Sequence, residues 1–106
     1  MRVLFDQGTP VPLRNLLDSH QIKTAYEMGW SKLSNGDLLA AVGRELFEVL
    51  VTTDKNIISQ QNLHGMPIAI VVLSSTRWPR IQLVSDAIDS AIDAATPGTI
   101  TEVNNP

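Results

Sequence analysis

The sequence predicts an α/β fold, a three-layer sandwich in which helices cover both faces of a mostly parallel sheet of about four to five strands. Three apolar runs lack the in–out alternation of half-exposed strands, which is typical of parallel strands covered on both faces. Segments with helical spacing separate these runs, and strands that alternate with helices indicate right-handed crossovers. With 106 residues, the chain is expected to form a single domain over 1–106.

Five segments are predicted to be strands. The continuous apolar runs are 3–5, 48–52 and 67–73, and they are expected in the middle of the sheet. The segment 21–25 (QIKTA) places β-branched residues between polar ones, so it suits a strand nearer an edge. The segment 99–103 (TITEV) alternates and is expected to form another edge strand.

Four segments have the apolar spacing of helices: 10–17, 37–46, 54–63 and 79–95. Ser34 or Asn35 is placed to cap the second of these helices. The last is the clearest, because its β-branched residues recur every three or four positions. Thr96-Pro97-Gly98 is expected to end it, since proline cannot continue a helix and glycine accepts left-handed angles.

Charge and cysteine content exclude several classes of protein. Eight Lys and Arg against eleven Asp and Glu give a net charge of −3, so binding to a polyanion by bulk charge is not expected. The lack of cysteine excludes a disulfide framework, a thiolate metal site and a cysteine nucleophile. No apolar run approaches the ~20 residues that span a bilayer, and no basic leader precedes one. We therefore expect a cytoplasmic protein with no membrane partner.

Two acids follow buried strands. Asp6 comes directly after the first apolar run, and Asp54 comes just after the third predicted strand. If these strands are neighbours, as in a 2-1-3-4 order, the two carboxylates face each other where the strand order reverses. Carboxylates ~4 Å apart repel by ~4 kcal/mol at an effective dielectric of 20. A shared proton, a basic partner or a divalent cation would offset that repulsion.

Oxygen-rich side chains near these acids favour Mg²⁺ or Mn²⁺ as the cation. Gln7, Asn56 and the acid or amide of the loop 34–37 are placed to complete an oxygen shell. An equally weighted alternative is that both acids only cap the helices that follow their strands. Spacing alone leaves the cation site and the capping role open.

Three short motifs resemble those of a known family. They are LFDQG over 4–8, GW at 29–30 with SNGDLL over 34–39, and VTTDKN over 51–56. In order and spacing they are similar to the short PIN-like family of bacterial and archaeal proteins, and the resemblance covers essentially the whole chain. It implies a PIN-like fold and a Mg²⁺- or Mn²⁺-dependent ribonuclease that hydrolyses RNA phosphodiesters. Small members are commonly toxins, so it also implies a small cognate antitoxin and a homodimer.

The resemblance assigns catalytic and metal-binding roles to three acids. Asp6 and Asp54 match the strand-end acids of the family, and Asp37 matches its acidic helix start. Amides stand at three positions where relatives often have acids, and they form a supporting polar shell: Gln7, Asn35 and Asn56. A less anionic site holds a cation more weakly. The alternative is therefore a catalytically degenerate PIN-like interaction module without enzymatic activity.

Basic residues near the predicted site could bind RNA. Lys55 adjoins Asp54, and Arg77 and Arg80 flank a tryptophan just past the strand that ends at 73. Two cations and an aromatic face at one sheet edge suit a single-stranded nucleic acid. The competing interpretation is that Trp78 begins a helix and packs on the core while both arginines are merely solvated.

The histidines and the remaining acids receive structural interpretations. His20 is expected in a turn before a strand and His64 in a loop, and neither has a partner at ligand spacing. Two histidines so far apart do not suggest a zinc site. Asp86, Asp89 and Asp93 are most simply the solvated face of the last helix.

A phosphoacceptor receiver-like domain is a rival interpretation of the whole chain. Such a domain also has an acid after its first strand, an acid near Asp54 and a hydroxyl after its fourth strand. It needs in addition a lysine after the fifth strand, whereas the last lysine of this chain is Lys55. The sequence therefore disfavours this class.

Overall fold

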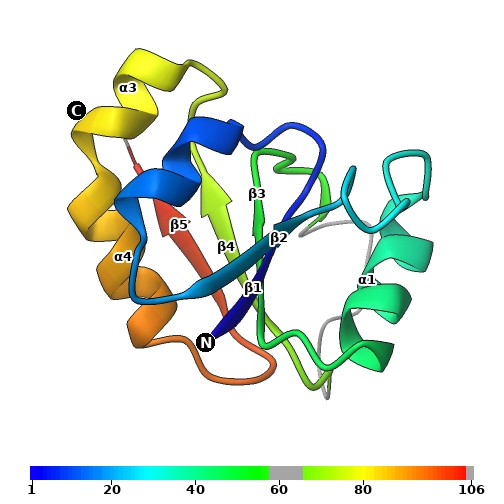
Figure 1. Cartoon of the computed structure of the whole chain (residues 1–106). Coiled ribbons are helices and arrows are strands. Elements are labelled where there is room, and N and C mark those ends of the chain that lie inside the picture. The colour runs from blue at the N-terminus through cyan, green and yellow to red at the C-terminus, as the bar shows by residue number, and fades with distance from the viewer. Residues whose placement is uncertain (58–65, 105–106) are drawn as a thin grey trace.

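The computed structural model describes residues 1–57 and 66–104 and has an α/β fold built on one sheet (Figure 1). The strands lie in the order β2-β1-β3-β4-β5. Their bounds are Arg2–Phe5 (β1), Gln21–Thr24 (β2), Val49–Thr52 (β3), Ala69–Leu73 (β4) and Ile100–Val103 (β5). All pairings are parallel, which confirms the predicted fold class and places the first and third strands side by side.

The middle strands are the most deeply buried part of the sheet. Every residue of β3 and β4 is buried, whereas β2 alternates and β5 buries only Val103. The predicted edge strands 21–25 and 99–103 therefore lie at the edges. A continuous apolar run is stable only where helices cover both faces of a strand, which explains the central position of the other three.

Helices flank both faces of the sheet (Figure 1). Their bounds are Val11–Leu16 (η1, a 3-10 helix), Asn35–Arg44 (α1), Trp78–Leu83 (α3) and Ser85–Asp93 (α4). Val3 and Phe5 enter a core with residues of η1, α3 and α4, whereas Leu4 between them enters a second core with residues of α1. Successive strand residues point to opposite faces, so one sheet supports two cores and the three predicted layers are present.

The capping of α1 follows from its sequence. Ser34 Oγ accepts a hydrogen bond from the backbone nitrogen of Asp37 at 3.3 Å, which confirms one of the two predicted caps. The helix starts two residues before the predicted 37. Beyond its end, Leu46 adopts a φ of 63°, although a Cβ disfavours that left-handed conformation. Leu46 is also 76% exposed, so its side chain contributes little packing.

The first predicted helix, 10–17, is not an α-helix. Val11–Leu16 forms a 3-10 helix that follows Pro10 and contains Pro12. Each proline removes a backbone donor, and short segments of this kind often close with the tighter i→i+3 bonds. Leu13 is fully buried, so the apolar spacing was informative even though the helix type was wrong.

The last predicted helix, 79–95, is two helices. α3 begins at Trp78, and Val84 then leaves the helical region with a φ of −113° and a ψ of 20° before α4 begins. The apolar residues Ile81 and Ile88 enter the same core on either side of this break. Apolar spacing therefore continues across the break and could not reveal it. The predicted stop at Thr96-Pro97-Gly98 does not end the helix, because α4 ends at Asp93; Gly98, with a φ of 82°, lies in the turn that follows.

The predicted helix over 54–63 lies largely outside the described residues. In the part that is described, the backbone nitrogen of Ile57 donates to the backbone oxygen of Asp54 at 3.3 Å, as in a turn. Among the residues that the structure describes, no helix is both long and apolar enough to cross a membrane.

We expect Leu46→Gly to stabilise the protein by about 1 kcal/mol, because glycine lacks the Cβ that opposes a left-handed conformation. Leu46→Ala keeps the Cβ and is the matched control, with an expected change within about 0.5 kcal/mol. Urea unfolding of the three proteins measures the effect. If the glycine variant is no more stable than the alanine variant, the backbone at this position is not strained.

Candidate functional site

Asp6 and Asp54 lie just past the carboxyl ends of the adjacent strands β1 and β3. We call this end of the strands the carboxyl edge of the sheet and the opposite end the amino edge. The backbone nitrogen of Asp6 donates to the Val51 oxygen at 3.1 Å, which extends the strand pairing beyond β1. Both acids line one cavity of about 240 Å³. Its other walls include Gln7, Gly8, Trp30, Asn35 and Thr53. The structure therefore brings the two predicted strand-end acids to one cavity.

The buried hydroxyl of Thr52 connects the two acids. Thr52 Oγ1 donates to Asp6 Oδ2 and accepts from the backbone nitrogen of Asp54 at 3.0 Å. The turn after β1 also approaches the end of β3 closely, because a Cβ on Gly8 would lie only 2.6 Å from Thr53 Oγ1. The contacts hold the two turns against each other, and sequence analysis did not single out Thr52.

Asp6 is a partly buried carboxyl that is hydrogen-bonded by neutral groups. Its Oδ2 accepts from Thr52 Oγ1. Its Oδ1 accepts from Thr9 Oγ1 at 2.7 Å and from the backbone nitrogen of Gly8 at 3.2 Å. Burial raises the pKa of Asp6 above its usual value, and the hydrogen bonds from Thr52, Thr9 and Gly8 offset this only partly. In the described part of the chain, no lysine or arginine forms an ion pair with Asp6.

Asp54 accepts one hydrogen bond from a side-chain amide of the predicted polar shell and one from a backbone nitrogen. Its Oδ2 accepts from Asn35 Nδ2 at 3.0 Å, and its Oδ1 accepts from the backbone nitrogen of Asn56 at 2.9 Å. The second bond is the local turn that aspartate commonly makes two residues ahead. Asn35 is the first residue of α1, so this helix contributes directly to the cavity.

Two other residues of the predicted site occupy different positions. Gln7 is exposed and lines the cavity of Asp6 and Asp54. Asp37 is exposed in the first turn of α1 and does not line that cavity, although Asn35 two residues earlier does. The mid-chain helix start therefore contributes an amide rather than its acid.

The predicted substrate-binding cations lie on the surface. Lys55 is exposed beside Asp54, and Arg77 and Arg80 are exposed at the start of α3. Trp78 between the arginines packs against the core with α4, as the competing interpretation expected. Neither arginine lines a cavity next to Asp6.

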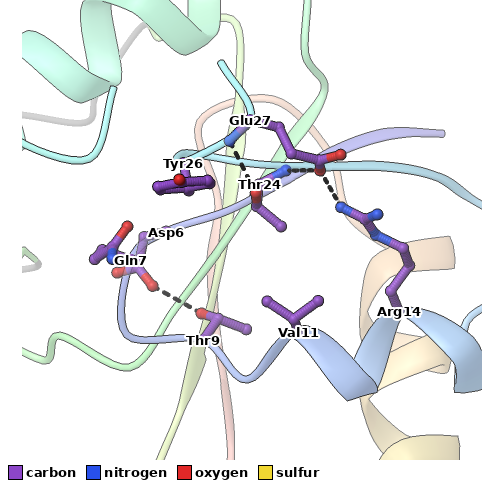
Figure 2. Close-up of a pocket in the computed structure, with 8 residues that line it drawn as sticks. All are labelled: Asp6, Gln7, Thr9, Val11, Arg14, Thr24, Tyr26 and Glu27. Atoms are coloured by element: carbon purple, nitrogen blue, oxygen red, sulfur yellow. Dashed lines mark hydrogen bonds and ion pairs between the residues drawn. The ribbon is translucent and has the colours of Figure 1, made fainter. Parts of the chain in front are cut away.

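A second cavity of about 400 Å³ adjoins Asp6 on the side of β2 and η1 (Figure 2). Arg14 pairs with Glu27 across it, and this hydrogen bond holds the pKa of Glu27 below its usual value. Glu27 Oε1 also accepts from the Thr24 nitrogen at 2.9 Å. The ring of Tyr26 borders the same cavity and is 76% exposed. Sequence analysis missed this cavity, since Arg14 and Glu27 share no local motif.

Near the amino ends of the strands lies a group of residues that sequence analysis did not bring together. His20 Nε2 lies 3.0 Å from Asp89 Oδ1 and 3.1 Å from Asp93 Oδ1. His20 therefore does have partners, and two of the predicted solvated acids of the last helix face it. These three residues form a group that could hold a metal ion. No spacing rule joins a turn before a strand to a helix near the other end of the chain, so only the fold reveals it.

No family model matches the chain, and comparisons with curated proteins and with solved structures give no match. The PIN-like resemblance therefore stays a prediction from short motifs, and the chemistry of the site must be argued from its own residues. Those residues offer carboxylate, amide and hydroxyl oxygens at the carboxyl edge of the sheet.

We expect Thr52→Val to raise the pKa of Asp6 further, because it removes the hydrogen bond that most lowers this pKa while keeping the side-chain volume. Thr52→Ser keeps a hydroxyl and is the matched control. A ¹³C NMR titration of the Asp6 carboxyl measures both. Equal pKa values in the valine and serine variants would contradict the role given to Thr52.

The sign of the matching stability effect follows from linkage. Since the folded-state pKa of Asp6 is raised, its contribution to stability is full below the unfolded pKa and is lost as pH rises through the folded one. A still higher folded pKa makes that loss larger. Urea unfolding at about pH 3 and pH 7 should therefore show Thr52→Val more destabilised, relative to Thr52→Ser, at the higher pH.

Proposed function

We propose that the chain is a cytoplasmic, PIN-like, Mg²⁺- or Mn²⁺-dependent ribonuclease that hydrolyses RNA phosphodiesters at Asp6 and Asp54. The observation that carries this proposal is that both acids line one cavity at the switch point of a 2-1-3-4-5 sheet. Ligands of open parallel sheets commonly bind at such a point. The raised pKa of the partly buried Asp6 carboxyl is a second support, because such shifts concentrate at functional sites.

The residues of this cavity fit a hard cation. An ionised carboxylate offers about four lone-pair sites. Among the described residues, hydrogen bonds occupy three of these sites on Asp6 and two on Asp54. The remaining sites suit Mg²⁺ or Mn²⁺, which prefer oxygen ligands and keep several waters. Asp37 lies outside the cavity, so we assign it no direct contact with the cation.

A cation held here would lower the pKa of a bound water and neutralise charge on the phosphate. The chain's own residues would position the RNA. The second cavity shares Asp6 and Gln7 with the first, so a strand bound across both places its phosphate beside Asp6. Tyr26 offers an exposed ring for base stacking, and the exposed Lys55 offers a cation for a flanking phosphate.

Asp6→Asn and Asp54→Asn should each weaken Mn²⁺ binding and RNA cleavage by at least about tenfold, since even outer-shell partners of a metal contribute about 10–100-fold. Asp86→Asn removes an exposed acid of α4 and is the matched control. Calorimetric titration with Mn²⁺ and cleavage of a labelled single-stranded RNA measure the two effects. Cleavage that survives both substitutions would contradict the proposal.

A catalytically degenerate interaction module is the second candidate. The observation that favours it is that each carboxylate oxygen of Asp6 and Asp54 already accepts a hydrogen bond. Amides at Gln7, Asn35 and Asn56 also make the site less anionic than one built from acids. If the folded wild-type protein binds no Mn²⁺ at millimolar concentration, this candidate is favoured over the ribonuclease.

The resemblance further suggests that the protein is a toxin that a small cognate antitoxin neutralises and that it forms a homodimer. The exposed Tyr26 and Val11, both at the second cavity, offer an apolar surface for such an antitoxin. A partner placed there would cover the approach to Asp6 and so block RNA.

Overexpression of the wild-type chain should slow bacterial growth, and Asp6→Asn should relieve this effect because it removes a proposed metal ligand. Growth curves at matched protein levels, checked by immunoblot, measure the difference. Equal toxicity of the two proteins would end the toxin proposal, and it would leave the nuclease test in vitro unaffected.

A further inference from the structure

His20, Asp89 and Asp93 form a compact group far from the proposed catalytic acids. His20 immediately precedes β2 and therefore lies at the amino edge of the sheet, whereas Asp6 and Asp54 follow their strands at the carboxyl edge. Asp89 and Asp93 lie one turn apart on α4, so both can reach the same point. In Figure 1 the chain before β2 runs beside α4.

The His20 ring is buried, and its Nε2 contacts both carboxylates without forming a hydrogen bond of good geometry to either. Its side chain is only 2% exposed. Within the described residues Nε2 makes no hydrogen bond, even though one oxygen of each acid lies 3.0–3.1 Å away. Buried polar atoms without a hydrogen bond are rare in folded proteins. An imidazole nitrogen held this close to two carboxylate oxygens, without a hydrogen bond to either, is placed to share a metal ion with them.

The distances among the three donor atoms fit one metal ion. An ion about 2.1 Å from each ligand places ligands about 3.0 Å apart at right angles and about 3.4 Å apart at the tetrahedral angles that Zn²⁺ prefers. The two nitrogen–oxygen distances are 3.0 and 3.1 Å, and all donor atoms lie within 4.8 Å of one another. Little movement is therefore needed to bind an ion.

We propose that His20 Nε2 and one oxygen each of Asp89 and Asp93 bind a divalent transition-metal ion of the Zn²⁺ class. Imidazole suits Zn²⁺, Co²⁺ and Ni²⁺, whereas Mg²⁺ and Ca²⁺ prefer oxygen ligands alone. Two carboxylates balance the charge of the ion. The Asp93 side chain is 61% exposed, so water reaches the ion and fills the remaining positions.

Neighbouring groups orient two of the ligands. Ser19 Oγ donates to Asp89 Oδ1 at 3.5 Å, and the Met1 nitrogen lies 3.3 Å from Nδ1 of His20. With Nε2 on the ion, the ring proton would be on Nδ1, the nitrogen that faces away from the ion. The bound ion then joins the turn before β2 to α4. Binding to the folded state alone makes it a structural clamp that raises Tm.

The test is a calorimetric titration of the full chain with Zn²⁺ at about pH 8, above the reference pKa of a free imidazole. His20→Gln should weaken Zn²⁺ binding by at least about tenfold, because even outer-shell losses cost about 10–100-fold. His64→Gln removes the other imidazole of the chain and should leave the affinity unchanged. Zn²⁺ should also raise the Tm of the wild type and of His64→Gln, but not that of His20→Gln.

A second pair of variants keeps the test decisive if His20→Gln does not fold. Asp93→Asn changes a mostly exposed side chain and should weaken Zn²⁺ binding by a similar factor, whereas Asp86→Asn on the same helix should not. Every titration is repeated in an Asp54→Asn background, where Zn²⁺ binding is expected to persist. That background separates this site from the proposed catalytic one, since RNA cleavage should fail there while Zn²⁺ binding survives.

Two results would overturn the proposal. One is a Zn²⁺ affinity that is equal in the wild type, His20→Gln and Asp93→Asn. The other is a folded wild-type protein that binds no Zn²⁺, in which case the group is a protonated histidine paired with two carboxylates.

Discussion

The carboxyl edge of the sheet depends on one buried hydroxyl, that of Thr52. It donates to the carboxylate of Asp6 and accepts from the backbone of Asp54, so it links the turns after β1 and β3 through a single oxygen. This link exists only because β1 and β3 are adjacent in the sheet. The hydroxyl also lowers the energy of the ionised Asp6, which burial alone would disfavour. The Thr52 hydroxyl therefore both holds the two turns together and limits the rise in the pKa of Asp6.

The two edges of the sheet present different donor sets. At the carboxyl edge, carboxylates meet amides and hydroxyls, a set of oxygen donors that suits Mg²⁺ or Mn²⁺. At the amino edge, a buried imidazole meets two carboxylates of α4, a set that suits Zn²⁺. Because their preferred ions differ, substitutions at one edge can be read separately from effects at the other. This gives the small fold two independent chemical surfaces.

The strands were predictable because burial acts on contiguous residues. The runs at 48–52 and 67–73 had to be covered on both faces, and they became the central strands β3 and β4. The helices were less predictable, because their spacing reports which face is buried and not how the backbone closes its hydrogen bonds. Prolines turned the segment 10–17 into a 3-10 helix, and the break at Val84 left the apolar face continuous.

The sequence alone determined where acids follow buried strands, because a strand ends where its apolar run ends and polar residues begin. It could therefore place Asp6 and Asp54 at one edge, given neighbouring strands. Only the tertiary structure decided that Asn35 rather than Asp37 reaches their cavity, and that His20 meets the acids of α4. Such contacts join segments far apart in the chain, and their geometry arises from the packing of helices on the sheet, which no local pattern encodes.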